Sequence, residues 1–380
     1  MRDLLEIRDE IDELDDKIVE LYERRMQLTT EVAEYKIETG KQIFDKERED
    51  SKLHTLEEKT HTDITRKGVR ELFEQIMAMS RKNQYQLLTA HGVNFDCEFT
   101  QVKGLDYSNA RIVFQGLEGA YSQEAMEQFF GENCDSFHVD TWKDAMEAIR
   151  TGKADYAVLP IENSSAGIVS ENYDLLVEYD NYIVGEQIIR INHALLGLAD
   201  AQESDITKIY SHKQSLMQCS DFLEAHKEWE KFSLSNNAVA AKKVKEDGRV
   251  DQAAIASAKN AEIYGLKVLK NSIQNNKNNS TRFIVVTGKK IYTPQANRIS
   301  ICFEVNHESG ALYQALSHFI YNDINMINIQ SRPIQNKNWE YRFFVDFEGT
   351  FSDNAVRNAL RGLKAVSYTH LRAHETRRHL

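Results

Sequence analysis

Residues 154–167 read ADYAVLPIENSSAG, and this stretch indicates the fold class of the central part of the chain. The apolar run Ala154–Pro160 has the length and composition of a buried strand, and it ends in hydrogen-bonding side chains that include Asn163. Ligands of open α/β sheets bind beyond the carboxyl ends of the strands. The stretch therefore predicts a buried strand with a polar site at its end.

Around this strand, the chain from 110 to 290 alternates between strand-like and helix-like runs. Further strands are predicted at Arg111–Phe114, Tyr182–Glu186, Ile209–Tyr210 and Phe283–Val286. Helices are predicted at Ser122–Phe130, Trp142–Arg150, Ser215–Ala225, Ala238–Lys245 and Ala253–Tyr264. This alternation predicts an α/β domain.

Three more polar clusters lie at the ends of predicted strands in this region. They are GLEGAYS (residues 116–122), YSH (210–212) with Gln218 on the following helix, and TRF (281–283). Any one of them has an ordinary explanation as a cap or a turn. The clusters together favour a binding cleft, and none has the G-x-G-x-x-G pattern of a dinucleotide site.

Residues 1–90 lack proline and are rich in charge, and they predict helices. Apolar residues recur at alternating three- and four-residue spacing from Leu4 to Tyr35, with no helix breaker before Gly40. Such a helix is about 50 Å long. The shorter helices predicted at 45–59 and 65–88 cannot cover it, so we expect a homodimer.

Polar residues interrupt the apolar seam of each of these helices. Arg25 occupies a seam position, where it could be a snorkelling arginine at the end of a buried patch. However, Lys36 lies on nearly the same face, residues 45–49 place three charges on one face of the second helix, and Ser80 and Gln84 interrupt the third. Unpaired buried charges are costly. The interruptions therefore predict a polar pocket for a charged ligand.

Residues 297–365 have a third pattern. It predicts, in order, a strand Ile299–Val305, a helix Gly310–Tyr321, strands Met326–Arg332 and Glu340–Phe347, and a helix Asp353–Leu363. This βαββα order is one strand short of a ferredoxin-like unit. Residues 366–380 are rich in Arg and His and do not have the pattern of the missing strand, so we expect an atypical tail there. Residues 91–109 show little periodicity and are interpreted as a linker.

Composition limits the possible partners and compartments. The formal net charge of -12 argues against nucleic acid as the main partner, although local basic sites can still bind an anionic small molecule. The four cysteines have no metal-ligand spacing, and the histidines form no metal motif. The chain starts without a secretory signal and has no apolar run of membrane-spanning length. We therefore expect a cytoplasmic protein without metal or cofactor and without a membrane partner.

The helical segment resembles the all-helical chorismate mutases over nearly its whole length. The matching residues are Arg8, Arg25, Lys36, Asp45, Arg48, Glu49, Ser80 and Gln84. The resemblance implies the rearrangement of chorismate to prephenate by positioning and electrostatic stabilisation. It also implies roles: Arg25, Arg48 and Arg8 of the partner subunit bind the two carboxylates. Lys36 and Gln84 would donate to the ether oxygen, and Asp45, Glu49 and Ser80 would orient the ring hydroxyl and the site.

Residues 110–290 resemble the prephenate dehydratases through the motifs GAYS, PIENS, YSH and TRF. The resemblance implies two α/β lobes with a cleft, similar to bacterial solute-binding proteins, and the decarboxylation of prephenate to phenylpyruvate with loss of hydroxide. Thr281 would be the proton donor, while Asn163, Ser211 and Gln218 would position the substrate. Arg282 would act structurally or on a carboxylate, and we interpret His212 as structural rather than as an acid.

Residues 297–365 resemble an ACT domain. Gly310, Ala311 and Leu312 match one phenylalanine-binding motif of the family, and Ser331, Arg332 and Pro333 match the other, with Gln330 in place of the usual glutamate. The resemblance implies feedback inhibition by L-phenylalanine bound between paired copies, hence a homodimer or a higher homo-oligomer.

The sequence as a whole is therefore interpreted as a bifunctional chorismate mutase/prephenate dehydratase, an isomerase and lyase of phenylalanine biosynthesis. One alternative is a non-catalytic regulatory protein that binds an amino acid or another solute, which would leave the charged helices unexplained. The other is a mutase fused to a prephenate dehydrogenase, which would require a nucleotide-binding fingerprint.

Overall fold

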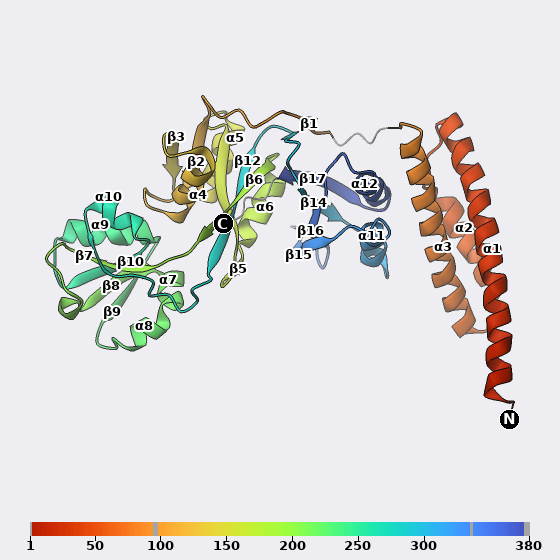
Figure 1. The fold of residues 1–380 in the computed structure, drawn as a ribbon, viewed down its shortest axis with the longest axis horizontal. Helices are drawn as coiled ribbons and strands as arrows, with labels where there is room; N and C mark the ends of the chain where they lie inside the picture. The colour runs from red at the N-terminus through yellow and green to blue at the C-terminus, as the bar shows by residue number, and fades with distance from the viewer. Residues whose placement is uncertain (1, 94–97, 335–336, 376–380) are drawn as a thin grey trace.

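The computed structural model describes residues 2–93, 98–334 and 337–375, with only the backbone described from residue 370 onward. The chain forms an N-terminal helical part, two α/β lobes and a C-terminal α+β unit (Figure 1). None of the helices within these ranges is long and apolar enough to cross a membrane.

The N-terminal part consists of α1 (Leu4–Thr39), α2 (Lys46–Glu57) and α3 (Asp63–Ala90). As predicted, α1 ends at Gly40, whose left-handed backbone (φ 68°) is easily adopted by glycine. Both α1 and α2 pack against α3.

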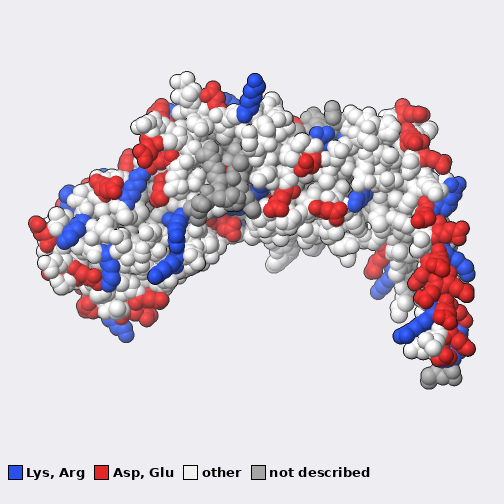
Figure 2. All heavy atoms as spheres, in the orientation of Figure 1, with Lys and Arg blue, Asp and Glu red and all other residues white. Residues whose placement is uncertain are grey.

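The long helix α1 leaves most of its apolar side chains uncovered. Only Thr29 and Ala33 of this helix are buried. The exposed large hydrophobic residues are Leu4, Leu5, Ile11, Leu14, Ile18, Val19, Leu21, Leu28, Val32 and Tyr35. Acidic side chains gather along the same helix (Figure 2). The helix thus presents a long apolar stripe beside an acidic surface.

The first lobe is built around the strand predicted within residues 154–167. Its strands are β2 (Arg111–Gln115), β3 (Asp135–Val139), β4 (Tyr156–Asn163), β5 (Gly167–Ile168), β6 (Tyr182–Arg190) and β12 (Ser280–Thr287). Its helices are α4 (Tyr121–Phe130), α5 (Trp142–Arg150) and α6 (Ser170–Glu178). Strand β12 runs antiparallel between β4 and β6, and its register places Thr281 opposite Asn163.

The second lobe has a five-stranded sheet in the order β11-β7-β10-β8-β9. Its strands are β7 (Ala194–Gly197), β8 (Lys208–His212), β9 (Glu230–Leu234), β10 (Gln252–Ala256) and β11 (Lys267–Lys270). Its helices are the short 3-10 helix η1 (Glu203–Asp205), α7 (Lys213–Gln218), α8 (Ser220–Glu224), α9 (Asn237–Asp247) and α10 (Lys259–Tyr264). The chain passes between the lobes twice, through residues 191–193 and residues 271–279.

The predicted helix Ala253–Tyr264 is wrong in its first half. Residues 252–256 form β10, which pairs with β7 and β8 in the middle of the sheet, and the helix α10 begins only at Lys259. A short, fully buried apolar run has no periodicity that separates strand from helix. Pairing on both sides decides in favour of a strand here.

The C-terminal unit contains β14 (Arg298–Glu304), α11 (Ala311–Ile320), β15 (Met326–Pro333), β16 (Tyr341–Glu348), α12 (Asn354–Val366) and β17 (Tyr368–Glu375). Its strands follow the order β15-β16-β14-β17, and β17 also touches β6, which joins this sheet to that of the first lobe. Helix α12 packs against α3.

The expectation of an atypical tail is wrong for residues 368–375, because they pair with β14 and complete a βαββαβ unit. An unpaired β14 edge would leave a row of backbone N–H and C=O groups without partners, so the backbone pairs there despite the unusual side chains. Residues 376–380 of the predicted tail lie outside the described residues.

The predicted linker, residues 91–109, contains the short strand β1 (Thr100–Gln101), which pairs with β13 (Ile291–Tyr292). Residues 94–97 of this linker lie outside the described residues.

A buried ionic cluster joins the first lobe to the C-terminal unit. Arg298 donates to Asp346 at 2.6 Å and to Glu186 at 3.1 Å, and Arg282 donates to Asp346 at 3.2 Å. Burial by itself would raise the pKa of Asp346, but the guanidinium groups of Arg282 and Arg298 hold it below its ordinary value. The motif residue Arg282 is therefore part of this inter-domain cluster.

We predict that a fragment of residues 1–95 sediments as a dimer, because the apolar stripe of α1 is too long to remain exposed. Analytical ultracentrifugation measures this. The same fragment with Leu14→Glu and Ile18→Glu on the stripe should be monomeric or unfolded. A folded, monomeric unmodified fragment would contradict the prediction.

Candidate active sites

Helices α1 and α3 bring the first pair of predicted mutase residues together. The Nη1 of Arg25 donates to the Oγ of Ser80 at 2.5 Å, while Ser80 donates to the carbonyl of Ile76 one turn earlier at 2.8 Å. Burial lowers the pKa of Arg25, and Tyr22 and Glu49 oppose this shift electrostatically. Arg25 is thus a partly desolvated cation whose hydrogen bond goes to a neutral hydroxyl.

Lys36 has a comparable environment at the start of α2. Its Nζ donates to the carbonyl of Ile43 at 2.6 Å. Burial lowers the pKa of Lys36, although the carboxylates of Asp45 and Glu49 act in the opposite direction. Asp45 itself caps α2 by accepting a hydrogen bond from the backbone N–H of Arg48 at 3.1 Å. The cap therefore fixes the turn that holds these charges beside Lys36.

Gln84 lies on the buried face of α3 with 6% of its surface exposed. Within the described part of the chain, its Oε1 has no hydrogen-bond partner. A buried amide without a partner costs free energy. The position is consequently prepared for a polar ligand.

Arg81 also lies in this pocket, and the sequence analysis missed it. It forms an ion pair with Glu49 and lies over the ring of Phe44, 5.1 Å from its centroid. The sequence signal that could have indicated it is the four-residue spacing of Met77, Arg81 and Tyr85, which places them on one face of a helix. In the structure all three are buried.

Arg8 does not reach this pocket in the single chain. It is exposed, and it lies 17 residues before Arg25 on the same helix, which corresponds to about 25 Å. The structure therefore brings together the other predicted mutase residues but not this one.

In the first lobe, strand pairing brings together Asn163 and Thr281. The Nδ2 of Asn163 donates to Thr281 Oγ1 at 2.9 Å. The Oδ1 of Asn163 accepts the backbone N–H groups of Ser165 and Ala166 at 3.0 and 2.8 Å. Backbone N–H groups can only donate, so they fix the orientation of this amide. The hydrogen of the Thr281 hydroxyl is consequently free to point away from Asn163.

The second crossing segment connects the two lobes through its asparagines. Asn279 Oδ1 accepts from Asn163 at 2.9 Å, and Asn276 donates to Ser165 Oγ at 3.1 Å. At the other end, the backbone N–H of Asn275 donates to the carbonyl of Gln218 at 2.8 Å. The run QNNKNN before Thr281 is the sequence signal that could have indicated these roles.

The predicted site residues of the second lobe contact other residues of that lobe and the segments that cross between the lobes. Ser211 is fully buried and donates to the carbonyl of Ile255 at 2.7 Å. The Oε1 of Gln218 lies 2.9 Å from Nε2 of His193, a buried residue that the sequence analysis missed. His212 caps α7 through Nδ1 and is exposed, which agrees with its structural interpretation. Among the described residues, neither Ser211 nor Gln218 forms a hydrogen bond with Thr281.

The GLEGAYS turn packs against the second lobe. Gly119 has a positive φ of 92°, and a Cβ atom at this position would lie 2.3 Å from Oδ1 of Asn260. Asn260, on α10, donates to the carbonyl of Gly119 at 2.9 Å. Glycine is therefore required by both backbone conformation and close approach.

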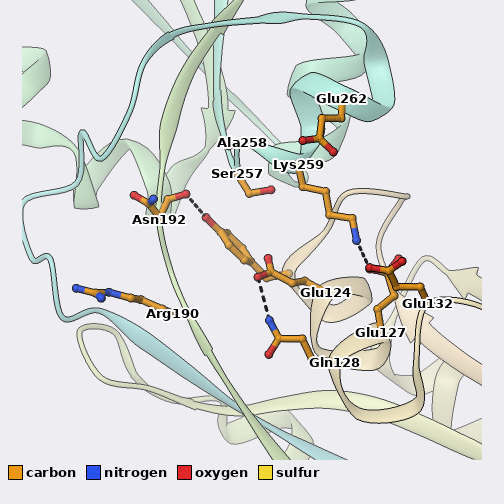
Figure 3. A pocket seen from close by; sticks show the side chains of 11 residues that line it. Glu124, Glu127, Gln128, Glu132, Arg190, Asn192, Ser257, Ala258, Lys259 and Glu262 are labelled. Carbon is orange, nitrogen blue, oxygen red and sulfur yellow. Dashed lines mark hydrogen bonds and ion pairs between the residues drawn. The ribbon is translucent and has the colours of Figure 1, made fainter. Parts of the chain in front are cut away.

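A cavity of about 530 Å³ lies at the seam between α4 and the start of α10 (Figure 3). Figure 3 shows Lys259 directed at Glu127 across this seam, with further carboxylates from Glu124, Glu132 and Glu262 on its walls. The only cations that line the cavity among the described residues are Lys259 and Arg190. The four glutamates outnumber them, so the cavity does not suit an anionic substrate. Tyr121 of the GAYS motif lines this cavity, but the predicted catalytic and substrate-binding residues Asn163, Ser211, Gln218 and Thr281 do not.

The predicted effector motifs lie in the C-terminal unit. Gly310, with φ 82°, precedes α11, which Ala311 begins, and Leu312 packs on the core of this unit. Ser331 and Pro333 are exposed on the edge strand β15, whereas Arg332 forms a two-point ion pair with Asp174 of α6. The described residues show no hydrogen bond between the two motifs. A second cavity, of about 940 Å³, separates Gly310 and Ala311 from Glu49 and Arg81 of the mutase helices.

Metal-ion chemistry has no prepared site in the described ranges: no group of three or more His, Cys, Asp or Glu side chains is placed to hold an ion.

Two family models match the chain. The model described as chorismate mutase type II matches residues 7–85, and that of prephenate dehydratase matches residues 112–291.

Curated relatives match almost the whole length. A bifunctional chorismate mutase/prephenate dehydratase from Buchnera aphidicola subsp. Acyrthosiphon pisum is 32% identical and covers 96% of this chain and 94% of the relative. The Escherichia coli K12 protein of the same description is 31% identical and covers 96% and 93%. Among solved structures, a prephenate dehydratase from Arthrobacter aurescens in complex with L-Phe matches with a TM-score of 0.66 and 28% identity, covering 70% of this chain and 90% of that one.

Proposed function

The chain belongs to the bifunctional chorismate mutase/prephenate dehydratases, and on this premise we propose how its residues catalyse the two reactions and how phenylalanine regulates them. The two catalytic steps are chorismate to prephenate in the helical part and prephenate to phenylpyruvate in the two lobes. The alternative of a non-catalytic solute-binding protein is not retained.

For the mutase, Arg25, Arg48 and Arg8 of the partner subunit bind the two carboxylates of chorismate. Lys36 and Gln84 donate to the ether oxygen, where negative charge develops as the C–O bond breaks. Asp45, Glu49 and Ser80 orient the ring hydroxyl. One observation supports this assignment: Arg25 and Lys36 are partly buried cations, and among the described residues they donate to a neutral hydroxyl and to a backbone carbonyl. The exposed stripe of α1 supports a dimer in which Arg8 enters the other subunit's pocket.

Lys36→Ala should reduce mutase kcat/KM by about a hundredfold or more, since a single donor to a developing oxyanion contributes this much. Dehydratase activity measured with added prephenate should stay unchanged in the same sample. Lys41→Ala, an exposed lysine five residues later, is the matched control. Equal loss of both activities in a folded Lys36→Ala protein would contradict the assignment.

For the dehydratase, Thr281 donates its hydroxyl hydrogen to the departing ring hydroxyl of prephenate. The bond to the ring carboxylate breaks, its electron pair completes the aromatic ring, and the hydroxyl leaves as water together with carbon dioxide. The contact that carries this proposal is the 2.9 Å hydrogen bond from Asn163 to Thr281 Oγ1. It leaves the hydroxyl hydrogen for the substrate, and it stabilises the oxygen as that hydrogen is given up. Asn163, Ser211 and Gln218 position the substrate.

Thr281→Val keeps the shape of the side chain but removes the hydroxyl. We expect dehydratase kcat to fall by about a hundredfold or more, the usual contribution of a proton donor. Thr281→Ser, which retains the hydroxyl, should keep most of the activity. Steady-state kinetics with prephenate measures both variants, and a Thr281→Val enzyme of near-normal kcat would exclude the role.

The C-terminal unit acts as an ACT domain that binds L-phenylalanine through Gly310, Ala311, Leu312, Ser331, Arg332 and Pro333. The βαββαβ order and the exposed edge strand β15, available for pairing with a second copy, support this. The dehydratase relative in complex with L-Phe supports the same ligand. Arg332 binds Asp174, whose neighbour Tyr173 packs at Phe344 beside the buried ionic cluster, so the effector motif contacts the catalytic lobe directly.

Chorismate supplied without any cofactor should yield phenylpyruvate, and L-phenylalanine should suppress it. In Asp174→Asn the phenylalanine concentration for half inhibition should rise about fivefold or more, the scale of a typical allosteric coupling. Glu304→Gln, which breaks the Arg342 ion pair within the same unit, is the control. Unchanged inhibition in Asp174→Asn would show that this ion pair does not transmit the effector's binding.

A further inference from the structure

His193 lies at the hinge between the two lobes and has no assigned role. It follows β6, only 1% of its surface is exposed, and both ring nitrogens have partners. Nε2 lies 2.9 Å from Oε1 of Gln218, on the second lobe, and Nδ1 lies 3.2 Å from the hydroxyl of Tyr121, on the first. The ring therefore connects the GAYS motif to the helix that follows the YSH motif.

The backbone holds this ring in place from both crossing segments. The N–H of His193 donates to Oε1 of Gln274 at 3.0 Å, and the N–H of Ile273 donates to the carbonyl of His193 at 3.0 Å. Asn275, from the same crossing segment, donates to the carbonyl of Gln218. The imidazole and the amide are thus fixed relative to one another by a common frame.

The partners of the ring define its proton. The Oε1 of Gln218 is an acceptor, so Nε2 is the protonated nitrogen and Nδ1 carries a lone pair. This lone pair faces the hydroxyl of Tyr121, which also donates to the carbonyl of Asn192 at 2.9 Å. Burial lowers the pKa of His193, and the hydrogen bond to Gln218 acts in the opposite direction. Because Oε1 of Gln218 accepts from the imidazole, the NH₂ group of Gln218 points away from His193. The opposite amide orientation would present a carbonyl oxygen to an anionic substrate, which is unfavourable.

We propose that His193 is a positioning residue of the dehydratase site, which holds Oε1 of Gln218 through Nε2–H and so presents the Gln218 NH₂ group to a carboxylate of the bound substrate. The inference rests on the proposed function, in which Gln218 binds prephenate.

The first test uses steady-state kinetics of the full-length chain with prephenate. His193→Leu should lower kcat/KM about tenfold or more, chiefly through a higher KM, because a binding contact made in the ground state is lost. His193→Gln, which retains a donor near the position of Nε2, should stay within about threefold of the unmodified enzyme. The double variant His193→Leu/Gln218→Leu should lose no more than Gln218→Leu alone, since His193 acts only through that amide.

Far-UV circular dichroism and a cooperative thermal unfolding transition of each sample report whether the two lobes are folded. Losses that multiply in the double variant, or a normal His193→Leu enzyme beside an impaired Gln218→Leu enzyme, would overturn the inference while leaving the proposed function intact. An unmodified chain that forms no phenylpyruvate would instead overturn the proposed function, and this inference with it.

A second test measures the protonation of the ring in the unmodified chain. In the full-length chain labelled with ¹⁵N-histidine, His193, assigned by comparison with His193→Gln, should give the NMR pattern of a neutral imidazole protonated on Nε2 at pH 7. An imidazolium, or a ring protonated on Nδ1, would contradict the proposal.

Discussion

Much of this structure depends on one strand, β12, and on the alternation of its side chains. Adjacent residues of a strand point to opposite faces of the sheet. Thr281 therefore faces Asn163 on one side, while Arg282 enters the ionic cluster with Asp346 and Arg298 on the other. A shift of one residue in register would exchange these positions, so the pairing of β12 with both β4 and β6 fixes the site and the inter-domain contact together.

The ionic cluster on the other face of β12 joins two domains at the expense of an unfavourable desolvation free energy. Buried charges lose their hydration, and only close geometry with several partners compensates for this. Here two guanidinium groups meet the carboxylates of Glu186 and Asp346, and Ser300 adds a hydrogen bond to Asp346 at 2.6 Å. Such a cluster tolerates little displacement. A movement of the C-terminal unit would consequently displace Arg282, which binds Asp346 of that unit and directly follows Thr281.

The two catalytic parts differ in which elements supply the proposed site residues. The residues proposed for the dehydratase site come from both lobes, and the asparagine-rich crossing segment contacts residues of both, with His193 at the hinge. The proposed mutase pocket is built by α1, α2 and α3, whereas Arg8 is exposed on the apolar stripe of α1, outside this pocket. One side of α3 lines this pocket and another side packs against α12. The mutase helices and the C-terminal unit therefore contact each other through α3.

Composition and periodicity were enough to divide this chain into its parts, and the motifs that resemble known families predicted its two reactions. Local patterns predicted the long helix ending at Gly40, a buried strand at Ala154–Pro160 and all but the last strand of the C-terminal unit, because helix capping and periodicity are properties of neighbouring residues. Features that depend on residues far apart in the chain became visible only in the fold. It made residues 252–256 a central strand and residues 368–375 an edge partner of β14, because backbone pairing overrides side-chain pattern there. It also placed Arg81 and His193 in the two sites, since a lone buried polar side chain has no meaning until the fold supplies its neighbours.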